Sequence, residues 1–154
     1  MDFQLSLNSE TVSAAHPDGP LATAADSSIA SVMQLMKMQR TGAVLICEQD
    51  RLAGIFTERD ALRLMRERAD LTRPVREVMS TNPVTVSPKS DVGEAIQRMS
   101  EGGYRHLPIV DEQGQASGIV AVRGLVHYLV EHFPATIYNL PPQPDSAPAR
   151  REGA

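Results

Sequence analysis

The sequence predicts a mixed α/β (α+β) fold made of two β-α-β-β-α repeats that pack with pseudo-two-fold symmetry. The first observation is an internal repeat, because residues about 64 positions apart match between Pro20 and Phe133. Matched pairs include Pro20 with Pro83, Ser27 with Ser90, Met36 with Met99, Ile46 with Ile109, Gly54 with Gly118 and Arg59 with Arg123. The second is the same order of helix-like and strand-like patterns in both segments. Such a repeat is one supersecondary unit used twice, and two packed copies enclose equivalent clefts where small ligands can bind.

Each repeat begins with a short extended piece, residues 21–24 or 84–87, followed by an amphipathic helix. The helix is predicted because apolar residues recur three and four positions apart. They are Ile29, Val32, Met33 and Met36 in the first repeat and Val92, Ala95, Ile96 and Met99 in the second. Ser27 and Ser90 precede these runs, and we expect them to cap the helices.

Two strand-like runs joined by a polar turn come next, and a second helix closes each repeat. The runs cover residues 43–47 and 52–56, and then 107–110 and 117–122. The closing helices carry Ala61, Leu62, Leu64 and Met65, and then Leu125, Val126, Leu129 and Val130.

The remaining segments flank or connect the repeats. We expect an N-terminal extension (1–19), repeat one (20–69), a linker (70–82), repeat two (83–133) and a proline-rich tail (134–154). Arg73-Pro74 favours a helix stop in the linker, since the residue before a proline avoids helical backbone angles. The tail is expected to be disordered or loosely docked because of its proline content.

Composition argues against several classes of protein. The chain has 154 residues, 42% of them hydrophobic, which suffices for one compact domain or two small halves with a shared core. A net charge of −4 argues against a nucleic-acid binder, which usually carries a basic excess. The single Cys47 fits a reducing cytoplasm, and no apolar run approaches the roughly 20 residues of a membrane span. We therefore expect a cytoplasmic protein with no membrane or nucleic-acid partner.

Thr57 and Asp60 lie where a predicted strand ends and a helix begins, and two interpretations are open. A carboxylate there can accept hydrogen bonds from both vicinal hydroxyls of a ribose, and the helix N-terminus favours a nearby phosphate. The same Thr-x-x-Asp spacing also fits an ordinary helix start, with Thr57 as the cap and Asp60 in the first turn. Spacing alone favours the second interpretation.

Several local motifs resemble the cystathionine-β-synthase-type (CBS) domain. They are Val75–Val86 ahead of an amphipathic helix, Tyr104–Asp111, Gly118–Val120 and Gly54–Asp60. The resemblance implies a tandem CBS pair, a regulatory module that usually binds adenosine-containing ligands between its halves. It also implies a homodimer, because such pairs commonly associate through their helices. The family places its ribose-binding aspartate at the position of Asp60, which reverses the balance between the two interpretations.

The resemblance assigns residues of both repeats to the same cleft. These are Ala43, Ile55, Thr57 and Asp60 from repeat one, and Pro83, Val84, Thr85, Arg105 and His106 from repeat two. Backbone groups near Val84 and Thr85 would read the adenine edge, while Arg105 and His106 would pair with phosphates. The alternatives are a structural imidazole for His106 and a solvated surface charge for Arg105.

The second cleft departs from this pattern. Alignment of the two repeats puts Ala121 at the position of Thr57 and Gly124 at that of Asp60. The second cleft thereby loses its ribose anchor and its hydroxyl, so we expect one competent nucleotide site per chain.

No catalytic or metal-binding cluster stands out in the sequence. Cys47 lies in an apolar run and is expected to be buried, while His127 and His132 are five apart and so face different directions on a helix. We therefore expect a non-enzymatic sensor that requires no cofactor. Its regulatory ligand would be AMP, ADP, ATP, NAD or S-adenosylmethionine, and its output a partner protein or a homo-oligomer. The alternative is an interaction or dimerisation scaffold with no functional nucleotide site.

Overall fold

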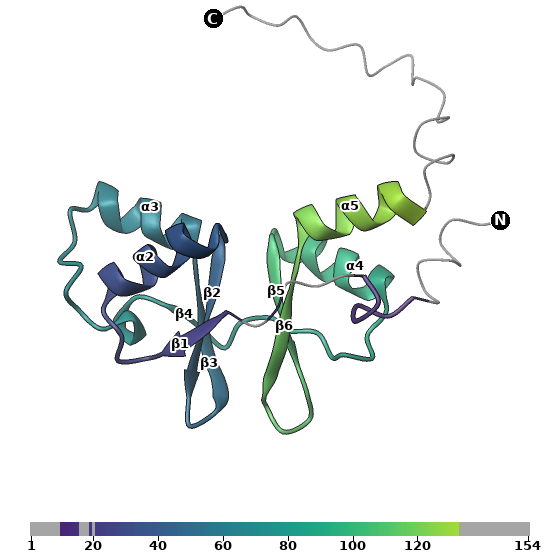
Figure 1. The fold of residues 1–154 in the computed structure, drawn as a ribbon, viewed down its shortest axis with the longest axis horizontal. Coiled ribbons are helices and arrows are strands. Elements are labelled where there is room, and N and C mark those ends of the chain that lie inside the picture. The colour runs from purple at the N-terminus through teal and green to yellow at the C-terminus, as the bar shows by residue number, and fades with distance from the viewer. Residues whose placement is uncertain (1–9, 16–18, 20, 133–154) are drawn as a thin grey trace, which may run out of the picture.

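The computed structural model describes residues 10–15, 19 and 21–132. Figure 1 shows two halves side by side, with one β-hairpin of each half meeting the other at the centre and helices flanking them. The predicted proline-rich tail, most of the predicted N-terminal extension and Pro20 lie outside the described residues.

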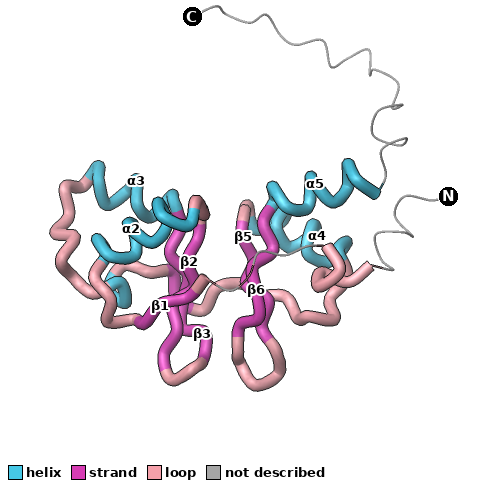
Figure 2. The backbone as a smooth tube through the Cα atoms, viewed as in Figure 1, coloured by secondary structure: helices cyan, strands magenta, loops and turns pink. Residues whose placement is uncertain are grey.

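Repeat one forms most of a four-stranded sheet and two helices. Its elements are β1 (Ala22–Ala24), α2 (Ile29–Gln39), β2 (Ala43–Glu48), β3 (Arg51–Thr57) and α3 (Glu58–Arg66). The strand order is β1-β2-β3-β4, with β1 parallel to β2 and the other neighbours antiparallel. Gln49 and Asp50 make the turn of the β2–β3 hairpin seen in Figure 2, and both have positive φ (49° and 61°). Two-residue hairpin turns favour this geometry because it matches the twist of the strands.

Residues 70–82, predicted as a linker, complete this sheet. They contain the 3-10 helix η1 (Val75–Glu77) and β4 (Ser80–Thr81), which pairs with the middle of β3. Gly54 of β3 allows the close approach, because a Cβ there would lie 2.7 Å from the Ser80 carbonyl oxygen. The segment is therefore part of the packed structure of repeat one.

Repeat two follows the same order with a reduced first strand. Its elements are α4 (Val92–Gly102), β5 (His106–Val110), β6 (Ala116–Ala121) and α5 (Val122–His132). The extended piece predicted at 84–87 makes one parallel bridge, from Val86 to Ile109, in the place of β1. The predicted mixed α/β fold of two repeats is confirmed.

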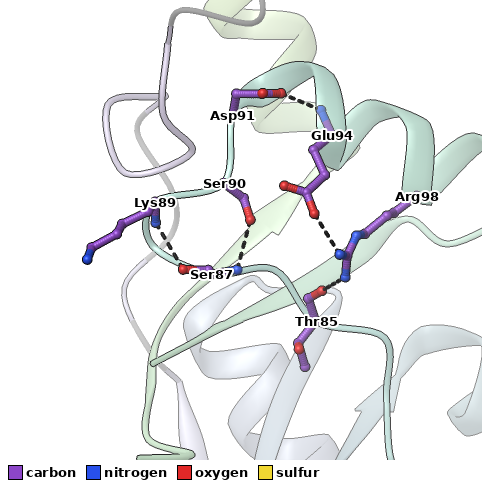
Figure 3. Close-up of polar contacts among 7 residues, drawn as sticks. All are labelled: Thr85, Ser87, Lys89, Ser90, Asp91, Glu94 and Arg98. Carbon is purple, nitrogen blue, oxygen red and sulfur yellow. Dashed lines mark hydrogen bonds and ion pairs between the residues drawn. The ribbon is translucent and has the colours of Figure 1, made fainter. Parts of the chain in front are cut away.

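The helix caps lie one residue later than predicted. Ser28 caps α2 and Asp91 caps α4, each by accepting a hydrogen bond from an amide in the first turn (3.1 and 2.7 Å). The prediction of Ser27 and Ser90 as caps was therefore wrong. The Ser90 hydroxyl oxygen instead accepts a hydrogen bond from the Ser87 amide (3.1 Å), because the chain is still turning before the helix begins (Figure 3).

The core of each repeat is closed by a segment that pairs with the start of the first helix of that repeat. Residues 10–15 bridge to the start of α4, just as residues 73–78 bridge to the start of α2. Val12 is fully buried in the core of repeat two, and Val75 is fully buried in the core of repeat one. The N-terminal segment thus crosses over to complete the second repeat.

The apolar core has one part in each repeat and a junction between them. Side chains of β2 alternate between these parts, because successive residues of a strand point to opposite faces. Val44 and Ile46 pack with the helices of repeat one, whereas Ala43 and Leu45 face the junction. The buried junction residues are Ala43, Leu45, Ile55 and Ile119. The cavity described next lies beside this junction, since Ile55 belongs to both.

Candidate functional site

A cavity of about 570 Å³ opens between the two repeats. Its wall combines the β3–α3 boundary, the segment around β4 and the loop before β5. The lining residues are Gly42, Ile55, Thr57, Glu58, Arg59, Asp60, Leu62, Ser80, Thr81, Asn82, Pro83, Val84, Gly103, Tyr104, Arg105 and His106. A cavity of this size lies in the range typical of small-molecule sites.

Most of the predicted site residues meet at this cavity. Those that line it are Ile55, Thr57, Asp60, Pro83, Val84, Arg105 and His106. Ala43 does not line it, because its side chain is fully buried in the junction, and its neighbour Gly42 lines the cavity instead. Thr85 does not line it either, and its carbonyl accepts a hydrogen bond from Arg98. The part of each residue in ligand binding stays a prediction.

Sequence reasoning missed several lining residues. Residues 80–82 reach the cavity because β4 pairs with β3, and a strand of two residues carries no periodic signal. Glu58 and Arg59 directly follow Thr57 at the start of α3, so the predicted helix start contained the information needed to include them.

Asp60 is about nine-tenths buried at the N-terminus of α3. Its Oδ2 accepts hydrogen bonds from the Thr57 backbone amide (2.9 Å) and the Thr57 hydroxyl (3.2 Å). Its Oδ1 lies 3.6 Å from a guanidinium nitrogen of Arg63, one turn along the helix. The arrangement is that of a capping box, so Thr57 and Asp60 do form the helix start that their spacing predicts.

Capping leaves Asp60 with spare acceptor capacity. An ionised carboxylate has about four lone-pair positions, and the two Thr57 donors occupy two of them. The contact with Arg63 is long and that side chain is 44% exposed, so the pair contributes little. One carboxylate can therefore cap α3 and still accept hydrogen bonds from two hydroxyl groups, which makes the two sequence interpretations compatible.

Side chains of both acidic and basic residues line the cavity. A Cβ on Gly42 would lie 3.1 Å from Glu58 Oε2 and 3.2 Å from His106 Nε2, so the glycine lets both side chains approach the backbone. Arg59 and Arg105 add two exposed guanidinium groups to the wall. The guanidinium and imidazole groups are donors suited to phosphate.

The extended wall segment is held from outside by α4. Arg98 donates a hydrogen bond to the Thr85 carbonyl and pairs with Glu94 (2.6 Å), as Figure 3 shows. One residue further, Val86 makes two backbone hydrogen bonds with β5, each 2.9 Å long. The backbone of Val84 in the cavity wall is therefore positioned by its two successors in the chain.

The pairing register supports the alignment of the second cleft. Thr57 ends β3 opposite the first residue of β2, and Ala121 ends β6 opposite the first residue of β5. Gly124 follows in α5 at the position of Asp60, and a Cβ on it would meet no atom within 4 Å. At these positions the second cleft has neither a carboxylate nor a hydroxyl.

A family model described as the CBS domain matches residues 16–67 and 75–131. The chain belongs to the CBS domain family. The two matches cover both predicted repeats, so the tandem CBS pair expected from the resemblance is confirmed. Proteins of this family are generally regulatory and non-catalytic.

Two curated relatives illustrate how much of the chain is shared. The CBS domain-containing protein YhcV of Bacillus subtilis is 41% identical over 101 residues, which make up 65% of this chain and 71% of the relative. An uncharacterized 17.7 kDa protein of Acidianus ambivalens is 34% identical over 104 residues, which make up 67% of this chain and 63% of the relative.

Solved CBS structures share the fold of this pair. The CBS domain protein from Pyrobaculum aerophilum complexed with AMP has a TM-score of 0.72 at 24% identity, covering 79% of this chain and 96% of its own. The CBS domain pair of protein MJ0100, in complex with 5-methylthioadenosine and S-adenosyl-L-methionine, has a TM-score of 0.70 at 19% identity. That match covers 76% of this chain and 97% of the other. At these identities the likeness establishes the fold.

Candidate groups elsewhere in the CBS pair do not form a second chemical site. Burial raises the pKa of the Cys47 thiol, which disfavours the reactive thiolate. His127 pairs with Glu131 (3.0 Å), and the His132 ring bonds to the Tyr128 carbonyl (3.0 Å), so the two histidines have separate partners. Within residues 10–15, 19 and 21–132, no three His, Cys, Asp or Glu side chains are grouped to hold a metal ion. No helix in that part of the chain has the length and apolarity needed to cross a membrane.

Proposed function

We propose that this CBS pair is a regulatory, non-catalytic module that binds one adenosyl ligand per chain in the cavity between its repeats. The ligand would be AMP, ADP, ATP, NAD or S-adenosylmethionine. The observation that carries the proposal is the buried Asp60 carboxylate, which keeps free acceptor positions at the wall of a cavity built from both repeats. The same carboxylate caps α3, so it is held in place before a ligand arrives.

Different parts of the wall suit different parts of such a ligand. Asp60 would accept hydrogen bonds from the two ribose hydroxyls, and Ile55 offers an apolar surface to the base. The backbone of Val84 would read the edge of the base. Arg105 and His106 would bind phosphate through charge-assisted hydrogen bonds, or the equivalent charged group of another adenosyl ligand.

The solved neighbours support the class of ligand. AMP, 5-methylthioadenosine and S-adenosylmethionine, bound to two CBS proteins of the same fold, have the adenosine group in common. We infer from them only that the ligand of this pair contains adenosine. Which phosphate or sulfur substituent it carries is a question for experiment.

Signalling would run through a homodimer or a regulated partner protein in the cytoplasm. Support for a homodimer comes from apolar side chains exposed on α3 and α5, among them Leu62 (69%), Met65 (61%) and Val126 (54%). The two helices lie on the same side of the pair in Figure 2, so their exposed faces can form one surface. The double substitution Leu62→Glu and Val126→Glu should yield a monomer in light scattering, and a monomeric parent protein would contradict the homodimer and leave a regulated partner protein as the output.

One observation favours a second function, an interaction scaffold with no functional nucleotide site. Asp60 already has a complete structural role, because it satisfies the Thr57 amide at the start of α3. A carboxylate with that role would be retained whether or not a ligand binds.

Thermal unfolding with each of the five ligands distinguishes the two functions, with GMP and GTP as controls of similar charge. A ligand present at a hundred times its Kd stabilises the folded state by about 2.7 kcal/mol, which raises the melting temperature by several degrees. We expect at least one adenosyl ligand to do so and the guanine nucleotides not to. No shift with any of the five, and no heat in calorimetric titration, would leave the scaffold as the function.

A further inference from the structure

Pro108 in β5 of repeat two occupies the position equivalent to Leu45 in β2 of repeat one. Each is the third residue of its strand, and each pairs with an equivalent isoleucine of the next strand. The Leu45 amide donates a hydrogen bond to the Leu21 carbonyl (2.9 Å), which extends the parallel ladder one rung beyond β1. A proline has no amide hydrogen, so the corresponding rung in repeat two, from residue 108 to the Val84 carbonyl, cannot form.

The parallel ladder of repeat two therefore stops at the edge of the cavity. Val86 keeps both of its bonds, one donated to the Pro108 carbonyl and one accepted from the Val110 amide. Two residues earlier, the Val84 carbonyl accepts no hydrogen bond from any described residue, and Val84 lines the cavity. The carbonyl that accepts a strand hydrogen bond in repeat one thus accepts none in repeat two, and it belongs to a residue that lines the cavity.

We infer that Pro108 is a positioning residue that sets the base specificity of this site by keeping the Val84 carbonyl free for an amino group of the ligand. The inference rests on the proposed function. A 6-aminopurine presents two N–H donors at its exocyclic nitrogen, whereas a 6-oxopurine presents an acceptor there. A free backbone carbonyl favours the first and repels the second. Pro108 would act through Val84 without touching the ligand.

The same comparison gives a reason for the difference between the clefts that is independent of Ala121 and Gly124. In repeat one the Leu45 amide occupies the Leu21 carbonyl, which is the counterpart of the Val84 carbonyl. Restoring a threonine and an aspartate to the second cleft would return a ribose anchor beside a carbonyl that already accepts one strand hydrogen bond.

A matched pair of substitutions tests the inference. Pro108→Ala supplies an amide hydrogen to the Val84 carbonyl. Lactic acid, the α-hydroxy analogue of alanine, introduced at the same position by nonsense suppression has the same methyl group but an ester oxygen in place of N–H. Calorimetric titration would compare AMP with purine riboside 5′-monophosphate, which lacks the amino group. The melting temperature of each variant would record any loss of stability separately, because the ester also weakens the Leu107 carbonyl as an acceptor.

We expect the parent protein to bind AMP about fivefold to tenfold more tightly than purine riboside 5′-monophosphate, a difference that corresponds to one hydrogen bond. Pro108→Ala should reduce that preference to below about twofold, and the ester variant should retain it. Equal preference in the two variants would overturn the inference while leaving the proposed function intact. A parent protein that binds AMP without preferring it over the analogue would do the same. A parent protein that binds none of the five adenosyl ligands would overturn both.

Discussion

Replacing Asp60 with asparagine separates ligand binding from helix capping. The carboxylate receives two hydrogen bonds from Thr57 through Oδ2, which leaves acceptor positions for donors in the cavity. Asparagine keeps one oxygen that can accept from the Thr57 amide, but it loses the charge and the second acceptor oxygen. Binding should therefore suffer more than folding.

The two expected losses differ in size. Hydrogen bonds to a charged group contribute about 1.5–3 kcal/mol, so Asp60→Asn should weaken nucleotide binding by about tenfold to a hundredfold. The folded state loses the interaction of a negative charge with the N-terminus of α3, about 0.3–1 kcal/mol. Asp60→Ala also removes the acceptor of the Thr57 amide, which costs about 0.5–1.5 kcal/mol, so that variant mixes the two effects.

Asp91→Asn is the matched control, because Asp91 caps α4 with the same type of side chain and does not line the cavity. Both variants would be measured by calorimetric titration and by urea unfolding. We expect similar small losses of stability and a loss of affinity in Asp60→Asn alone. Affinity within about twofold of the parent protein in Asp60→Asn would refute the ribose assignment and with it most of the proposed site.

Four further predictions follow, three from the structure and one from the proline content of the tail. Calorimetric titration should give one ligand per chain, and two equal sites would show that the second cleft is competent. Val12→Ala should cost about 2 kcal/mol of unfolding free energy, because Val12 is fully buried in the core of repeat two, whereas removal of residues 140–154 should leave the melting temperature nearly unchanged. A stable Val12→Ala protein would contradict the crossover of the N-terminal segment. Because burial raises the pKa of Cys47, its alkylation by iodoacetamide should be slow at pH 7.5 and still accelerate above pH ~8.5, and a plateau by pH 8 would contradict it.

The order of the longer elements could be predicted from the sequence because each one carries its own periodic pattern. Helix α2 and the β2–β3 hairpin are examples, with apolar residues at helical spacing and two apolar runs around a polar turn. Strand β4 and the segment 10–15 could not be predicted in this way. Each is short, and each is fixed by partners distant in sequence, namely β3 and the start of α4.

The candidate site was predictable to the extent that it depends on local sequence. Thr57 and Asp60 are three residues apart and interact directly, so their spacing in the sequence is enough to predict their contact. Ala43 was assigned one residue away from Gly42, and in a strand a shift of one residue moves a side chain to the opposite face. The Thr85 carbonyl is bonded by a side chain thirteen residues further along the chain, a contact that no local pattern contains.

The buried junction between the repeats is small. Its buried apolar cluster has four residues, and the hairpin tips are joined by a hydrogen bond from the Leu52 amide to the Gly114 carbonyl (3.1 Å). Asp60 of repeat one lines the adjacent cavity together with Arg105 and His106 of repeat two. Under the proposed function, a ligand that bonds to both sides would add contacts between the repeats beside this junction. Allosteric coupling needs about 1–3 kcal/mol of difference in binding between two states. Under the proposed function, the ligand would signal by binding one packing of the repeats more tightly than another by this amount.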